Sequence, residues 1–279
     1  MGCARAPAGS WRWFACGYLP SDDSLLSDSV SVVMAVYNGR EFLPEQMDSV
    51  LSQLLPGDEL IVIDDASTDG GVEFLKRPMF EGVRLFTNSR NRGVIASFQR
   101  GLYQARHGVV FLCDQDDLWL PGKRAAFLAE FARDSAVCVV ISDAELIDRA
   151  GNRLAPSFMA SRGGFDGTVL GTLWRNRFLG CAMAVRRSLL DVALPFPKGV
   201  PMHDMWIGIV GSVSGRIVYL PTPYLRYRRH GNNLTPIRSQ EPWHRLVRWR
   251  VSLFLVLVQR LLSVRLGLHK RAVPRDLDR

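Results

Sequence analysis

Two groups of acidic residues are the side chains of this sequence best suited to chemistry. Each group directly follows an apolar run: Asp64 and Asp65 follow residues 60–63, and Asp114, Asp116 and Asp117 follow residues 109–113. Carboxylates gathered at one place repel one another unless a cation joins them. Magnesium takes one or two protein carboxylates together with substrate phosphates. The pattern therefore predicts a Mg²⁺ or Mn²⁺ site for a ligand that carries a diphosphate.

The elements that must position these acids follow from the apolar pattern. Buried strands are predicted at 31–37, 60–63, 83–86, 109–113 and 136–142, and helices at 41–55, 93–106 and 121–133. This alternation predicts a mainly parallel sheet with helices on both faces. Ligands bind beyond the carboxyl ends of such strands, so the two acidic groups should converge. The alternative is that the acids are helix caps and turn formers, which we favour for Asp117 taken alone.

After residue 143 the alternation changes. We expect an edge hairpin at 145–152, a strand at 181–185, a helix at 204–213, and short strands at 217–220 and 224–227. The first half then reads as a cofactor-binding half and the second as a substrate-binding half. Both halves are expected to share one sheet.

Composition excludes several classes of protein. The chain has 279 residues, of which 47% are hydrophobic and 22% charged, so it is neither disordered nor fibrous. No uncharged apolar run approaches the ~20 residues of a membrane-spanning helix. The phosphate-binding patterns of P-loop NTPases and nicotinamide dehydrogenases are absent. The five cysteines include no C-x-x-C pair, which argues against a disulfide framework and against a zinc site.

The basic charge is concentrated near the end of the sequence. Seven of the 35 basic residues, and no acid, lie between Trp243 and Ala272, while the rest of the chain is nearly neutral. This distribution argues against a nucleic-acid partner. An apolar stripe at helical spacing (243, 247, 251, 254, 257, 261, 264 and 268) predicts a basic amphipathic helix on a membrane surface. The alternative is a helix packed on the domain or on a second subunit.

Seven short motifs together resemble a known family. They are residues 32–39 (VVMAVYNG), 61–70 (IVIDDASTDG), 91–93 (NRG), 111–119 (FLCDQDDLW), 180–183 (GCAM), 202–206 (MHDMW) and 227–233 (YRRHGNN). Their order and spacing resemble the motif series of family 2 glycosyltransferases, and the last motifs most resemble the rhamnosyltransferase-like branch. The resemblance implies a GT-A fold, a nucleotide-diphosphate sugar donor, a divalent metal and inversion at the anomeric carbon.

The resemblance also implies roles for single residues. The base pocket would be lined by Ala35, Tyr37 and Asn38, with Asp64 or Asp65 accepting from the base and Arg92 near the nucleotide. The D-x-D motif would be Asp114 and Asp116, with Asp116 preferred as the direct metal ligand, Asp117 as a substitute and His230 near the metal or diphosphate. Asp204 would be the catalytic base. The competing structural roles are a surface arginine for Arg92, a structural histidine for His230 and a helix cap for Asp204.

These observations predict three segments and one activity. The segments are a poorly ordered extension over 1–28, a GT-A domain over 29–238 and a basic membrane-associating segment over 239–279. We expect an enzyme at the cytoplasmic face of the plasma membrane that adds a sugar to a glycolipid or polysaccharide. The preferred donor is dTDP-rhamnose. The alternatives are a UDP-hexose transferase of the same fold, or a catalytically silent membrane-bound module that binds nucleotide sugars.

Overall fold

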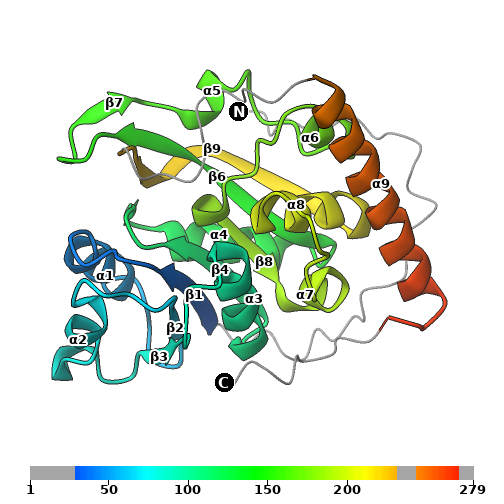
Figure 1. Ribbon diagram of the computed structural model, residues 1–279. Coiled ribbons are helices and arrows are strands. Elements are labelled where there is room, and N and C mark those ends of the chain that lie inside the picture. The colour runs from blue at the N-terminus through cyan, green and yellow to red at the C-terminus, as the bar shows by residue number, and fades with distance from the viewer. Residues whose placement is uncertain (1–28, 231–242, 270–279) are drawn as a thin grey trace.

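One mixed sheet organises the molecule (Figure 1). The computed structural model describes residues 29–230 and 243–269, so the extension predicted at 1–28 lies outside it. In the described part the sheet has nine strands in the order β3-β2-β1-β4-β8-β6-β9-β5, with β7 paired to β6. The strands are β1 Val30–Val36, β2 Glu59–Asp64, β3 Arg84–Thr87, β4 Val109–Asp114, β5 Leu118–Trp119, β6 Val137–Ile147, β7 Arg153–Ala155, β8 Met183–Arg186 and β9 Arg216–Arg228.

The strand directions bring the predicted acids to one edge. Strand β1 pairs in parallel with β2 and β4, and β2 pairs in parallel with β3. In the register between β1 and its neighbours, Ala35 lies opposite Asp114, and Val36 lies opposite Asp64. The parallel sheet predicted for the first half is therefore confirmed. Strand β8 enters antiparallel between β4 and β6, which joins the second half to the same sheet, as expected.

Helices connect and cover the strands. They are α1 Leu43–Leu51, α2 Gly71–Leu75, α3 Val94–Gln104, α4 Lys123–Arg133, α5 Phe158–Ser161, α6 Val169–Trp174, α7 Arg187–Ala193, α8 His203–Ser214 and α9 Trp243–Arg265, with 3₁₀ turns η3 Pro78–Phe80 and η4 Gly180–Ala182. Helix α3 packs closely on β1 and β2 at Gly101. A Cβ atom at this position would lie only 2.4 Å from Cγ1 of Val33, so a larger residue would not fit without a shift. This close packing holds the last turns of α3 against β1 and β2.

Strand β9 is the main departure from the predicted elements. Residues 217–220 and 224–227 belong to one strand that pairs in parallel with β6. Two prolines, Pro221 and Pro223, lie between the two predicted segments, and each lacks a backbone donor for the sheet. The register shift opposite Asp143 accommodates them as a bulge, and β6 itself continues through the first arm of the predicted hairpin.

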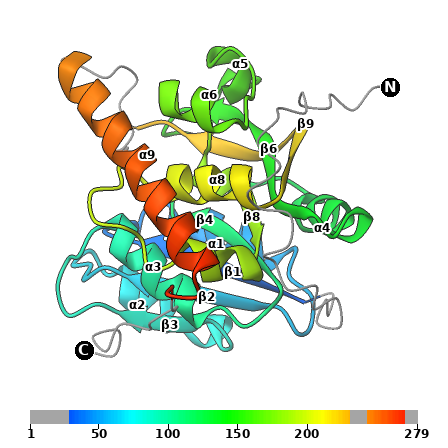
Figure 2. The ribbon, with the colours of Figure 1, turned by 90° about the vertical axis from the view of Figure 1, so that its right-hand side faces the viewer.

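Helix α9 lies across α7 and α8 (Figures 1 and 2). Leu253 and Leu257 are buried, so this helix packs on the domain. Within residues 29–230 and 243–269, no helix has the length and apolar character needed to cross a membrane.

Candidate functional site

The acids at the end of β4 form a cluster in which Asp117 is buried and Asp114 is half-buried. Ligand atoms of Asp114, Asp117 and Cys181 lie within 4.8 Å of one another. Oδ1 of Asp117 accepts a hydrogen bond of 2.9 Å from the backbone N–H of Arg228, whereas its buried Oδ2 has no partner among the described residues. Asp117 therefore contacts a distant strand, and the interpretation of this residue as a cap or turn former is wrong. An unpartnered carboxylate oxygen beside a second carboxylate fits a cation site.

Asp116 and His230 are brought together from opposite ends of the domain. Nε2 of His230 lies 2.6 Å from Oδ2 of Asp116. The imidazole also stacks on Phe42, with 5.0 Å between the ring centroids. Carboxylate oxygens are ligands that Mg²⁺ and Mn²⁺ prefer. The pair predicted to lie near the metal is thus adjacent in the fold, and its role in binding metal stays a prediction.

Burial changes the protonation of this cluster. Burial, together with the charges of Asp116 and Asp204, raises the pKa of Asp114 to about 7. Burial, together with the charges of Asp116 and Asp114, raises the pKa of Asp117 well above its usual range. Carboxyl groups that resist ionisation in this way gain most from a nearby cation, because a positive charge favours the carboxylate.

The cluster is supported by two basic residues that were not predicted from the sequence. Both donate hydrogen bonds to its backbone carbonyls. Lys123 is fully buried, and its Nζ donates to the carbonyl of Cys181 at 2.6 Å. Arg228 donates from Nε to the carbonyl of Asp116 at 2.9 Å and from Nη2 to Glu45 at 2.7 Å. Arg228 belongs to a quoted motif, but only the β9 pairing reveals its contact with the acids.

Asp204 approaches the site from the second half of the chain. It lies in the first turn of α8, where Oδ2 accepts from the N–H of Gly180 at 3.0 Å and Oδ1 accepts from the N–H of Met205 at 2.5 Å. Burial raises its pKa to about 6, and these two backbone donors limit the rise. The carboxyl group therefore titrates closer to neutrality than an ordinary aspartate does, and its role as the base stays a prediction. The N-cap residue of α8 is Met202, so Asp204 accepts a free N–H of the first turn without being the N-cap itself.

His203, next to Asp204, is a buried neutral ring. It stacks on Phe98 with 3.9 Å between the centroids, and burial lowers its pKa to about 3. Neither ring nitrogen has a hydrogen-bond partner within the described part of the chain. His203 therefore does not orient Asp204 through a hydrogen bond.

The predicted base-pocket residues lie where β1 ends. The backbone N–H of Tyr37 donates to Oε1 of Gln115 at 2.8 Å, and Nε2 of Gln115 donates back to the carbonyl of Tyr37 at 3.1 Å. Asn38 adopts a left-handed conformation and receives the N–H of Thr68 at 2.9 Å. Tyr37 is 46% exposed as a residue, and Ala35 is half-buried. Gln115 was not predicted, yet it joins the ends of β1 and β4.

The two acids after β2 organise loops. Asp65 accepts from Nδ2 of Asn88 at 2.6 Å and from the backbone N–H groups of Arg92 and Gly93 at 2.9 and 2.7 Å. Asp64 accepts from a backbone N–H of the following turn at 3.2 Å. Asp65 thus fixes the turn into α3. Their contact with a nucleotide base stays a prediction.

Arg92 lines an open cavity of about 290 Å³ between α3 and the loop over residues 196–200. Gln99 and Lys198 contribute its other polar side chains. Phe196, on the same cavity wall, lies 6.5 Å from the ring of His203. The cavity therefore lies between the two halves, near the start of α8.

The family model described as Glycosyl transferase family 2 matches residues 31–193. The chain belongs to this family. The match includes the end of β1, both acids after β2 and the acid cluster after β4. It ends before Asp204 and His230.

Curated relatives of this family 2 chain cover only part of it. The putative glycosyltransferase EpsE of Bacillus subtilis is 37% identical over 36% of this chain and 38% of its own length. The putative teichuronic acid biosynthesis glycosyltransferase TuaG of the same organism is 28% identical, over 52% of this chain and 60% of its own length. The chain thus spans less than two thirds of these two relatives.

Solved structures confirm the predicted GT-A fold. Residues 1–349 of TarS from S. aureus, in complex with UDP-GlcNAc, superpose with a TM-score of 0.64 at 19% identity, covering 86% of this chain and 72% of TarS. The mannosyltransferase PcManGT from Pyrobaculum calidifontis, in complex with GDP-Man and Mn²⁺, has a TM-score of 0.56 at 19% identity and covers 85% of this chain and 73% of its own. At these identities the likeness concerns the fold.

Proposed function

We propose that this family 2 member is an inverting, metal-dependent glycosyltransferase. It moves a sugar from a nucleotide-diphosphate donor to a hydroxyl group of its acceptor. The observation that carries this proposal is the meeting of two halves of the chain at one site. Asp204 of α8 accepts a hydrogen bond from the N–H of Gly180, and the next residue, Cys181, lies within 4.8 Å of the carboxylates of Asp114 and Asp117. The proposed base and the acids proposed to bind the metal and diphosphate therefore lie close together, which supports the proposal.

The residues of the chain divide the chemistry between them. Asp204 accepts the proton of the acceptor hydroxyl as that oxygen attacks the anomeric carbon. Asp114, Asp116 and His230 would hold the divalent cation, which neutralises charge on the departing diphosphate. Tyr37, Asn38 and Ala35 would line the base pocket, with Asp64 or Asp65 accepting from the base and Arg92 near the nucleotide. Direct displacement needs no covalent enzyme intermediate, so inversion follows.

The donor proposed first is dTDP-rhamnose, on the motifs that resemble the rhamnosyltransferase-like branch. A UDP-hexose is the second candidate. The complex of TarS with UDP-GlcNAc favours this alternative, because the same fold holds a uridine donor there. A purified-protein melting screen with dTDP-rhamnose, UDP-GlcNAc, UDP-glucose and GDP-mannose, with and without Mn²⁺, distinguishes them by the size of the stabilisation.

The acceptor proposed is a lipid-linked or polysaccharide acceptor at the inner face of the plasma membrane. The name of the relative TuaG, a putative teichuronic acid biosynthesis glycosyltransferase, supports a cell-surface polysaccharide. We propose residues 239–279 as the membrane-associating segment and 29–238 as the catalytic domain.

The test is metal-dependent turnover of the donor that stabilises the protein most. We expect slow hydrolysis of that donor, which releases a nucleoside diphosphate. This hydrolysis should stop when the metal is chelated. A protein that binds the donor but never cleaves it, with any of the acceptor classes supplied, would be the silent binding module instead.

A further inference from the structure

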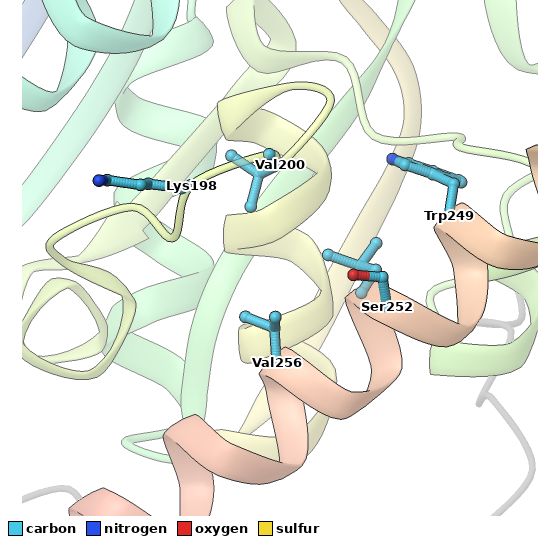
Figure 3. Close-up of a pocket in the computed structure, with 7 residues that line it drawn as sticks. Lys198, Val200, Trp249, Ser252 and Val256 are labelled. Atoms are coloured by element: carbon cyan, nitrogen blue, oxygen red, sulfur yellow. The ribbon is translucent and has the colours of Figure 1, made fainter.

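Helix α9 has two apolar sides, and one of them holds it to the domain. Leu253 and Leu257 are buried, and Trp249, Val256, Leu261 and Val264 pack partly buried against the core. Figure 3 shows Trp249, Ser252 and Val256 on the side of α9 that faces the Lys198–Val200 loop. The alternative of a helix packed on the domain is therefore correct for this side.

Basic residues of α9 take part in the same attachment. Nη2 of Arg250 donates to the carbonyl of Trp174 at 2.9 Å, with its guanidinium 5.2 Å from the centre of the indole ring. Arg260 donates to the carbonyls of Val192 and Pro195 at 2.8 and 2.7 Å. Two of the seven bases counted for the membrane thus hold the helix to the domain. The predicted stripe was also partly wrong, because it placed buried Leu257 with exposed Val251 and Phe254.

The second apolar side of α9 faces away from the domain. The exposed side chains there follow helical spacing: Val251, Phe254, Leu255, Val258 and Leu262 of α9, and Leu266 in the turn directly after it, with exposed fractions between 37% and 68%. We call these six residues the outer stripe. A continuous row of this kind is unusual on a protein surface and marks an interaction site. Trp174, 76% exposed, adjoins the same helix.

We propose that the outer stripe inserts into the boundary between headgroups and acyl chains of an anionic lipid bilayer, with α9 lying in the membrane plane. The acid-free segment from Trp243 to Ala272 favours an anionic surface over a second copy of the chain, since a dimer across this stripe would bring two basic segments together. An indole beside the helix suits the same boundary. This inference rests on the proposed function in one respect: the docked enzyme would reach the lipid-linked acceptor proposed above.

Apolar insertion and charge attraction respond differently to salt. Attraction between exposed charges is screened over about 8 Å at physiological ionic strength. Burial of apolar side chains is not weakened by salt in this way. Arg250 and Arg260 are used inside the molecule, which leaves at most five of the seven bases for the anionic surface. Salt should therefore weaken the binding, while the outer stripe should retain part of it.

The experiment compares two double variants in vesicle sedimentation. Leu255→Ser with Leu262→Ser removes two members of the outer stripe, which are 60% and 51% exposed. Met79→Ser with Leu154→Ser removes two equally exposed apolar side chains, 67% and 59%, from η3 and β7. Vesicles of phosphatidylcholine mixed with phosphatidylglycerol are the probe, at low and at high salt. We expect the stripe variant to lose about tenfold or more in partitioning, and the control to match the wild type.

Three results would overturn the proposal. The first is unchanged partitioning of the stripe variant. The second is wild-type binding that disappears at high salt. The third is a wild-type protein that is a dimer in solution and a stripe variant that is a monomer, with neither protein binding to vesicles. Because these side chains are exposed, both variants should melt like the wild type. Donor hydrolysis is measured separately, so an inactive enzyme leaves the vesicle result interpretable.

Discussion

The two halves of the molecule reach the site in different ways. In the first half, Asp64 and Asp114 are the last residues of parallel strands, and their strand register alone brings them to one edge. In the second half, Asp204 begins a helix and His230 follows a strand, and each meets the acids only through contacts distant in sequence. The first half thus presents its acids through local order. The second half supplies the base and the supports through tertiary packing.

The difference extends to electrostatics. Asp114 and Asp117 have raised pKa values because the second half buries them, with Cys181 and Asp204 close by. Without β8, β9 and α8 the same acids would face water and titrate as ordinary carboxylates. The comparison suggests that first-half substitutions remove binding, whereas second-half substitutions remove catalysis or support.

The largest effect is expected from Asp116→Ala in the first half. Transfer and metal-dependent donor binding should be abolished, because the diphosphate then lacks its bridging cation. Calorimetric titration with the donor and Mn²⁺ measures the loss. Asp48→Ala, which removes an exposed acid from α1, is the control. Full wild-type activity in excess EDTA would contradict the prediction.

In the second half, Asp204→Asn should separate catalysis from binding. Asparagine keeps the shape and can still accept a free N–H of the first turn, but it cannot accept the proton. Turnover should fall by about 10²–10⁴-fold, with donor and metal affinity near those of the wild type. Steady-state kinetics and donor titration check both parts. A variant that binds the donor and keeps normal turnover would show that Asp204 serves only the first turn of α8.

Arg228→Met tests whether the second half supports the first. The variant loses the bonds to the carbonyl of Asp116 and to Glu45, together with one to the carbonyl of Arg149. At about 1 kcal/mol for each bond, the free energy of unfolding should fall by about 3 kcal/mol, and Mn²⁺ should bind more weakly. Chemical denaturation gives the first quantity. Arg216→Met, which breaks an exposed pair with Asp134, should cost less than about 1 kcal/mol. Equal losses in the two variants would show that Arg228 is not a specific support.

The smallest effect is the pH dependence. A base with a pKa of about 6 must be ionised, so kcat/KM should fall about tenfold for each pH unit below 6. The contribution of Asp204 to folding stability depends on pH in the opposite direction. The folded state raises the pKa of Asp204 from 3.8, so it holds this proton more tightly than the unfolded chain, and that stabilisation is lost as pH rises from 3.8 to 6. The residual activity of Asp204→Asn should lack the acidic limb. If the fall in activity at low pH persists in this variant, another group is responsible for it.

Much of the site was predictable in the first half. Apolar runs ending in acids placed Asp64 and Asp114 at strand ends, because strand direction and side-chain burial are encoded over a few residues. The motif resemblance added Asp204 and His230. The contacts of Gln115, Lys123 and Arg228 were not predictable. Gln115 and Arg228 belong to quoted motifs, but a motif does not say which distant group a side chain contacts.

For α9, the sequence by itself determined a long, acid-free helix with many apolar positions. It did not determine which of those positions are covered, because a helix with two apolar sides satisfies the same periodicity in either orientation. Only the tertiary structure decided that Leu253 and Leu257 pack inward while Leu255 and Leu262 remain exposed. The same reason applies to Asp117 and Arg228, whose contact depends on the β9 pairing and its bulge. Residue types and short spacings determined what the chain can do, and long-range packing decided which side chains do it.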